Sequence, residues 1–187
     1  VATDVRGRVQ AILDQVEPTV AALAPTFKPE QLNHLARQFD KRNQKWRAEW
    51  LSNNPAERSE RRVKQLIEHG EMLYGRLEES QLAALRASEA VSAFDASAIH
   101  RETLRRQQDT LQTLRKIQSG ALGEGPARSE VRTLFGRSMH SPDPAYRSYL
   151  AKMIQDSCKA YANLHNSATT AQRIKMLETL KDYETDA

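Results

Sequence analysis

The chain has 187 residues, 39 % of them apolar, and its 28 Lys and Arg against 24 Asp and Glu give a formal net charge of +4 at pH 7. This apolar fraction lies below the roughly 45–50 % of ordinary globular chains, so we expect a thin core spread along the chain. The absence of sustained β-branched alternation disfavours a sheet fold, and no apolar run approaches the roughly 18 residues that would span a bilayer.

Two helices are predicted before residue 51. The first ends near Glu17, because Pro18 disfavours helical geometry in the residue before it. Its apolar face consists of Val5, Val9, Ile12, Leu13 and Val16. The second begins near Pro29, a residue favoured in a first turn, and carries both Trp residues on one apolar stripe. The stripe comprises Leu32, Leu35, Phe39, Trp46 and Trp50, interleaved with Lys41, Arg42, Lys45 and Arg47.

A capped break separates this helix from its successor. In Asn53-Asn54-Pro55, Asn54 is a favourable N-cap, Pro55 suits the first helical position, and Glu57 can reach back to the cap. The apolar face of the following helix comprises Val63, Leu66, Leu73 and Leu77. Gly75 costs about 1 kcal/mol relative to Ala inside a helix, so we expect a kink or short break there.

The second half of the chain contains similar helix-capping and helix-breaking residues. Asp95 is predicted to cap a helix that ends before Gly120. The segment 119–126 holds three Gly and is the best candidate for a hinge, and Pro126 is predicted to start a shorter helix. Asp143 is predicted to cap the next one. The stripe of that helix comprises Tyr146, Leu150, Ile154, Cys158 and Tyr161.

These elements predict an all-α fold. We expect six to eight helices in an antiparallel helical-hairpin array, and both a closed bundle and an elongated or curved layer stay open. Residues 1–187 are expected to form a single all-helical domain, with a hinge at 119–126.

A short pattern recurs at three predicted helix starts. Phe27–Gln31, Leu77–Gln81 and Ala168–Gln172 each place an apolar or small residue four positions before a Gln. Thr169 to Gln172 is in addition a capping-box pattern. Because helix N-termini recruit such residues in many proteins, the recurrence is explained by capping alone.

Several longer motifs occur in order along the chain. They are Leu23-Ala24-Pro25-Thr26-Phe27-Lys28-Pro29-Glu30-Gln31-Leu32, Phe39-Asp40-Lys41-Arg42-Asn43, Trp46, Trp50-Leu51, Arg61-Arg62-Val63, Tyr74-Gly75-Arg76-Leu77 and Arg105-Arg106-Gln107-Gln108-Asp109. Together they resemble a family of proteobacterial lipoproteins built on a domain of unknown function. The resemblance implies a periplasmic location and membrane attachment through a lipidated cysteine upstream of Val1, and it implies no activity. Because the chain begins with Val and not Met, we expect a processed or trimmed product.

The chain is also similar, more weakly, to helical periplasmic chaperones of the Spy and CpxP type, whose motif is Leu-Thr-x-x-Gln. Thr169 matches the Thr of that motif, whereas Lys28 and Glu78 stand in its place in the other two recurrences. This similarity implies a helical-hairpin architecture.

Catalytic and metal-binding patterns are weak. Ser138, His140 and Asp143 are close in sequence but lack the glycine frame of a nucleophile elbow. Cys158, the only cysteine, excludes an internal disulfide, and its place on an apolar stripe indicates a small core residue. No His pair shows zinc-ligand spacing. We therefore expect a non-enzyme without cofactor or metal.

Binding is the remaining class of function. The candidate interaction surface comprises Phe39, Arg42, Trp46, Trp50, Arg101 and Arg105. We expect it to contact a protein, a peptide or a lipid headgroup layer, as in a chaperone-like envelope protein. The alternative is a basic helical nucleic-acid-binding protein, which is disfavoured because Trp residues on an apolar stripe are usually buried. Gln107 and Gln108 lie close to the apolar stripe of their helix, which indicates that part of this face meets water or a partner.

Overall fold

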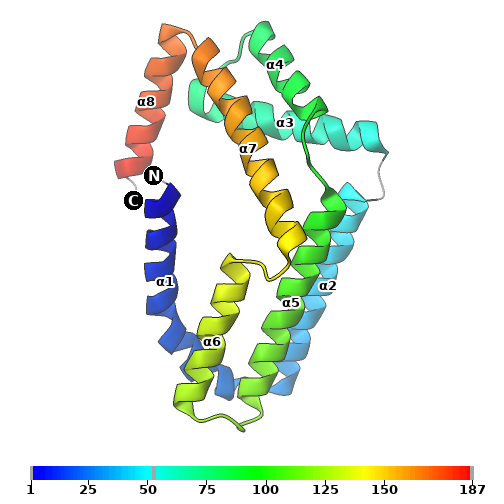
Figure 1. The fold of residues 1–187 in the computed structure, drawn as a ribbon, viewed down its shortest axis with the longest axis vertical. Helices are drawn as coiled ribbons and strands as arrows, with labels where there is room; N and C mark the ends of the chain where they lie inside the picture. Colours follow the sequence, from blue (N-terminus) through cyan, green and yellow to red (C-terminus); the bar gives the residue numbers. More distant parts are fainter. Residues whose placement is uncertain (1, 52–53, 186–187) are drawn as a thin grey trace. The chain divides into compact units, whose positions relative to one another are not determined.

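The computed structural model describes residues 2–51 and 54–185, which form helices joined by short connections without any strand (Figure 1). The helices are α1 (Ala2–Leu23), the short 3-10 helix η1 (Ala24–Thr26), α2 (Pro29–Trp50), α3 (Pro55–Tyr74), α4 (Glu79–Ala90), α5 (Ala96–Gln118), α6 (Glu124–Met139), α7 (Pro144–Ser167) and α8 (Thr170–Thr185). The predicted all-α fold with six to eight helices is confirmed. Within the described ranges, no helix has the length and apolar character that crossing a bilayer requires.

The chain divides into two compact units, Val1–Leu51 with Ala96–Arg147 and Ser52–Asp95 with Ser148–Ala187. Each unit has its own apolar core. The core of the first comprises Ala21, Ala24, Leu32, Leu114, Ile117, Ala127 and Val131, and that of the second comprises Tyr74, Leu77, Leu85, Leu164 and Ala168. The sparse apolar residues of the chain thus supply two small cores. A single domain over 1–187 stays a prediction, and so does a hinge at 119–126.

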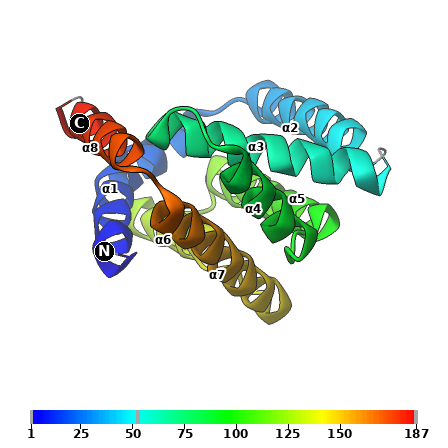
Figure 2. The ribbon, with the colours of Figure 1, turned by 90° about the horizontal axis from the view of Figure 1, so that it is seen from above.

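In the first unit, α2 lies beside α5 (Figure 1) and α1 lies beside α6 (Figure 2). Helices α2 and α5 run antiparallel, because Asn43 contacts Gln107 while Ala36, earlier in α2, lines the same groove as Arg115, later in α5. Residues 119–123 join α5 to α6, and Gly120 takes a φ of +72° directly after α5. Only Gly adopts this left-handed backbone without strain.

The predicted end of the first helix near Glu17 is wrong, since α1 continues through Pro18 to Leu23. Pro18 removes one helical hydrogen bond, but the helix is held at this point from outside. Arg132 Nε donates to Glu17 Oε2 at 2.7 Å and Arg128 Nε to Glu17 Oε1 at 3.3 Å, both from α6. The predicted apolar face is also wrong, because its members Val5, Ile12 and Val16 are exposed while Glu17, Ala21 and Ala24 are buried.

The capping predictions around α3 and α4 are confirmed. Asn54 Oδ1 accepts from the Glu57 backbone N–H at 2.9 Å, and Glu57 returns the contact by accepting from Asn54 Nδ2 at 3.0 Å. Asn53 lies outside the described residues. The break at Gly75 is real: α3 ends at Tyr74, Gly75 takes a φ of +72°, and α4 begins at Glu79.

The three recurrences of the sequence pattern share one local structure. In each, the Gln side chain accepts from the backbone N–H three residues earlier: Gln31 from Lys28 at 2.8 Å, Gln81 from Glu78 at 2.8 Å and Gln172 from Thr169 at 3.0 Å. The structure adds a fourth turn of the same spacing, Leu122–Pro126, where α6 follows its N-cap Gly123. The first residue of every turn packs into or against the core of its own unit: Phe27, Leu77, Leu122 and Ala168. A residue that packs into or against the core thus directly precedes the start of four helices, α2 and α6 in the first unit and α4 and α8 in the second.

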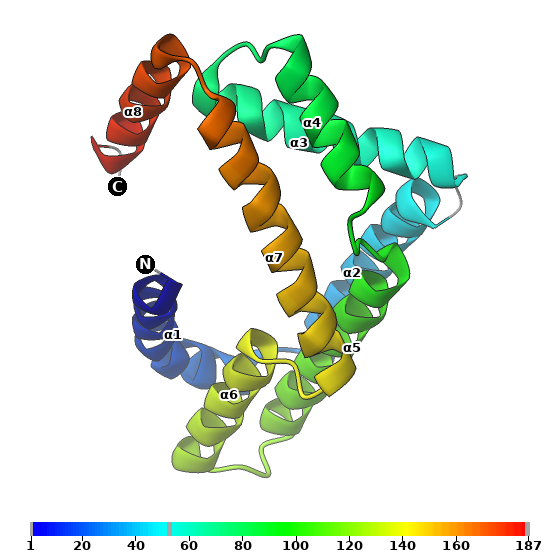
Figure 3. The same cartoon turned by 45° about the horizontal axis from the view of Figure 1, so that its top comes forward.

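In the second unit, two of these Gln side chains bind each other. Gln81 Nε2 donates to Gln172 Oε1 at 2.9 Å, and Gln172 Nε2 donates to Gln81 Oε1 at 2.9 Å. Each amide also donates to the turn of the other hairpin, Gln81 to the Ser167 carbonyl at 3.1 Å and Gln172 to the Arg76 carbonyl at 2.9 Å. Figure 3 shows the α3–α4 and α7–α8 turns that this pair joins. Capping thus explains the local pattern, and the reciprocal amide pair adds a contact between hairpins.

Candidate functional site

The aromatic residues of the predicted interaction surface lie on α2 and are largely withdrawn from solvent. Trp50 is only 5 % exposed, while Trp46 and Phe39 are half-buried. The two Trp rings stack with centroids 5.3 Å apart. Burial of Trp50 agrees with the predicted apolar stripe and removes this residue from any accessible surface.

The three Arg residues of that surface have different environments. Arg42 on α2 and Arg101 on α5 are exposed, and neither makes an ion pair with a described residue. Arg105 is half-buried and committed to its own unit: its guanidinium donates to both carboxylate oxygens of Glu102, at 2.8 and 2.9 Å, and to the Arg137 carbonyl at 3.0 Å. The predicted surface is therefore not one continuous basic patch.

Glu102 is the centre of an ionic network between α5 and the end of α6. It is 4 % exposed and also accepts from Arg106 at 2.8 Å and from the Ser141 hydroxyl at 3.0 Å. Burial raises the pKa of Glu102, but the hydrogen bonds from Arg105, Arg106 and Ser141 outweigh it and lower the pKa to about 2. This network is structural, because every carboxylate oxygen already has a partner.

A second bidentate contact completes this connection. Arg137 of α6 donates to the carboxylate of Asp109 of α5 at 2.6 and 2.8 Å. The hydrogen bond from Arg137 lowers the pKa of Asp109 against the effect of burial. Asp109, together with Arg105 held by Glu102, thus fixes α6 against α5 through Arg137, and these contacts leave the opposite face of α5 free for others.

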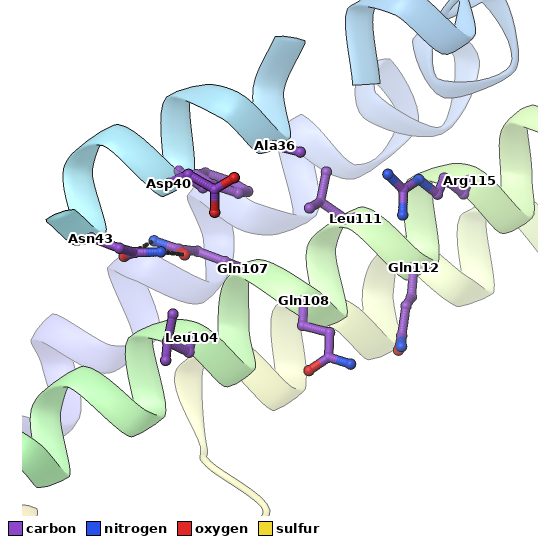
Figure 4. A pocket seen from close by; sticks show the side chains of 10 residues that line it. Ala36, Asp40, Asn43, Leu104, Gln107, Gln108, Leu111, Gln112 and Arg115 are labelled. Atoms are coloured by element: carbon purple, nitrogen blue, oxygen red, sulfur yellow. Dashed lines mark hydrogen bonds between the residues drawn. The ribbon is translucent and has the colours of Figure 1, made fainter. Parts of the chain in front are cut away.

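That opposite face forms an open groove with α2, of about 440 Å³ (Figure 4). Its lining comprises Ala36, Phe39, Asp40 and Asn43 from α2 and Leu104, Gln107, Gln108, Leu111, Gln112 and Arg115 from α5. Leu104 is 42 % exposed although it lies on the apolar stripe of α5. The volume lies within the usual range for ligand sites, and the mixture of apolar and amide side chains is typical of them.

The two helices are connected across the groove by one amide pair. Asn43 Nδ2 donates to Gln107 Oε1 at 2.7 Å, and Gln107 Nε2 donates to Asn43 Oδ1 at 3.1 Å (Figure 4). Asn43 is buried, and this reciprocal bond satisfies it. A buried amide pair of this kind fixes the register of packed helices, so it sets which α2 residues face which α5 residues in the groove.

The remaining polar groups of the groove are not used by the fold. Gln108 and Gln112 belong to the lining and point away from α2 at the α5 edge of the groove (Figure 4), and neither side chain hydrogen-bonds to a described residue. Asp40 and Arg115 also lie in the lining, without an ion pair in the described part of the chain. The groove therefore offers two amides, one carboxylate and one guanidinium beside exposed Leu104. The sequence drew attention to Gln107 and Gln108 beside the apolar stripe of α5, but not to Gln112.

Two other sequence candidates, Cys158 and Asp143, do not line the groove. Cys158 is exposed, so its interpretation as a core residue is wrong. Its neighbour Ile154 is 51 % exposed, because only part of that stripe of α7 packs. Asp143 caps α7, accepting from the Ala145 backbone N–H at 2.8 Å. Among the described residues, no cluster of His, Cys, Asp or Glu could hold a metal ion.

Comparisons with protein-family models, curated proteins and solved structures gave no match to this chain.

Proposed function

We propose that the chain is a non-enzymatic interaction module of the bacterial cell envelope that holds an extended or partly unfolded polypeptide segment in the groove between α2 and α5. The observation that carries this proposal is the groove itself, where an exposed Leu lies beside amides that the fold leaves unused. The envelope location rests on the resemblance to proteobacterial lipoproteins.

The side chains of the groove match the chemistry of a peptide chain. An extended backbone presents alternating N–H and C=O groups, and a Gln amide can donate to one and accept from the other. Covering the exposed part of Leu104 with an apolar client side chain would contribute about 1 kcal/mol. Such contacts suit peptides of many sequences, because they involve the peptide backbone and any apolar side chain.

A nucleic-acid ligand has less support. Stacking of bases needs accessible aromatic rings, whereas Trp50 is buried and Trp46 stacks on it. Arg105, a member of the predicted interaction surface, is occupied by Glu102.

The test is suppression of aggregation of a chemically unfolded client, followed by light scattering at equimolar protein. We expect the wild-type chain to suppress aggregation and Leu104→Glu to lose most of this effect, since a carboxylate would then occupy the groove. Leu177→Glu is the matched control, because Leu177 is 54 % exposed on α8 and does not line the groove. Failure of the wild type to suppress aggregation, or equal loss in both variants, would contradict the proposal.

A further inference from the structure

The groove has a distinct charge pattern along α5. Arg115 lies in the lining, and Arg101 lies beyond the other end, three residues before Leu104 and seven before Gln108. This spacing places Arg101 on the same face of α5 as Leu104 and Gln108. Both Arg side chains are exposed, and neither pairs with a described carboxylate.

The two guanidinium groups have a defined separation along the helix. Arg115 follows Arg101 by 14 residues, which corresponds to roughly 21 Å of α-helix. An extended chain covers this distance in about six residue steps. Asp40 lines the α2 wall of the groove between these ends. Its carboxylate would repel a negatively charged ligand side chain at the centre of the groove.

We infer that the preferred ligands of the groove are extended segments with an acidic residue at each end, about six positions apart, and an uncharged apolar residue between them. This inference rests on the proposed function and adds the class of segment that is bound. Each terminal carboxylate would accept a bidentate hydrogen bond from one guanidinium, while the central side chain, roughly 10 Å from either end, packs between Leu104 and Leu111, which both line the groove. Exposed Arg and carboxylate pairs contribute modestly, so they select among segments that the apolar contact already binds.

The experiment uses synthetic heptapeptides with Leu at position four and a neutral fluorescent label, and it measures binding by fluorescence anisotropy. One peptide carries Glu at positions one and seven, a second carries Gln there, and a third carries Lys. At low salt we expect the Glu peptide to bind wild type roughly 5-fold tighter than the Gln peptide, and the Lys peptide to bind weakest. High salt should remove most of these differences.

The variants test whether the two Arg residues cause the preference. In Arg101→Gln/Arg115→Gln, the Glu and Gln peptides should bind within about 2-fold of each other, because both carboxylate partners are gone. Arg37→Gln/Lys41→Gln removes the same charge from exposed positions of α2 outside the groove lining, and it should keep the roughly 5-fold preference. Equal losses in the two double variants would overturn the assignment in favour of general electrostatic attraction.

Two further results separate this inference from the proposed function. If the Glu and Gln peptides bind wild type equally, the acidic preference is refuted while the peptide groove stands. If replacing the central Leu by Ser leaves binding unchanged, or if no peptide binds, the proposed function itself fails. A short single-stranded oligonucleotide serves as competitor. If it displaces the labelled Glu peptide at a lower concentration than the unlabelled Glu peptide does, the site is assigned to nucleic acid instead.

Discussion

The reciprocal bond between Gln81 and Gln172 makes a quantitative prediction for the second unit. Gln172→Leu removes the four hydrogen bonds of the Gln172 side chain. It also deprives the side-chain amide of Gln81 of its hydrogen-bonding partner, although this residue is only 2 % exposed. Loss of a cap costs about 1 kcal/mol, and stranding buried polar groups costs about 1–3 kcal/mol more. We therefore expect a loss of about 3 kcal/mol in the free energy of unfolding.

The coupling between the two residues isolates the amide pair. Gln81→Leu should cost a similar amount, whereas the double variant should cost about 1–2 kcal/mol less than the sum, because neither amide is then stranded. Urea unfolding followed by far-UV circular dichroism measures these free energies, and hydrogen exchange in α4 and α8 assigns them to the second unit.

Gln31→Leu is the matched control for capping alone. Gln31 accepts from the Lys28 backbone N–H at 2.8 Å, as Gln81 does from Glu78, but it is exposed and has no amide partner among the described residues. Its loss should cost about 1 kcal/mol at most. A cost for Gln172→Leu no larger than that of Gln31→Leu, or additive costs in the Gln81 and Gln172 cycle, would refute the reasoning.

Three further outcomes are expected. The pKa of Glu102, about 2 in the folded state against 4.5 for the free residue, makes its stabilising effect complete above pH 4.5 and lost as pH falls towards 2. Between pH 7 and pH 2, the free energy of unfolding should therefore fall by about 3 kcal/mol more in wild type than in Glu102→Gln. An equal dependence of this free energy on pH in the two proteins would contradict the reasoning. Cys158, being exposed, should react with a thiol reagent in the folded chain as fast as in urea; protection in the folded chain would disprove its placement. Asn43→Leu should strand the amide of Gln107 and lower stability by about 1–3 kcal/mol, and unchanged urea unfolding would argue against the pair across the groove.

The breaks after α2, α3 and α7 could be predicted because their causes are local, whereas the start of α6 at Glu124 lies two residues before the predicted Pro126. Asn54 and Thr169 cap the helices that follow them through neighbouring backbone groups, and Gly75 ends α3 through its own φ. Three or four adjacent residues contain all of this information. The course of α1 could not be predicted, because Glu17 is held by Arg128 and Arg132 from more than a hundred residues away.

The site was less predictable, since residue type does not reveal partners. Arg101 and Arg105 look equivalent in sequence, yet only Arg105 lies within reach of Glu102 and of the Arg137 carbonyl. Apolar spacing also gives no sign of how far packing extends along a helix, so it predicted that Cys158 is buried while α7 leaves it exposed. Two local signals pointed to the groove. Phe39 of the predicted interaction surface lines it, and the Gln residues beside the α5 stripe suggested contact with something other than a dry core, because they lie at the edge of an apolar face.

Photo-crosslinking from within the groove tests the central claim most directly. In a Cys158→Ser background, a benzophenone is attached at Gln112→Cys, which lines the groove, or at Lys45→Cys, which is exposed on α2 outside it. With an unfolded client protein, we predict crosslinks from position 112 that an excess of Leu-containing peptide abolishes, and few from position 45. Equal crosslinking from both positions, or none from position 112, would contradict a polypeptide-binding groove between α2 and α5.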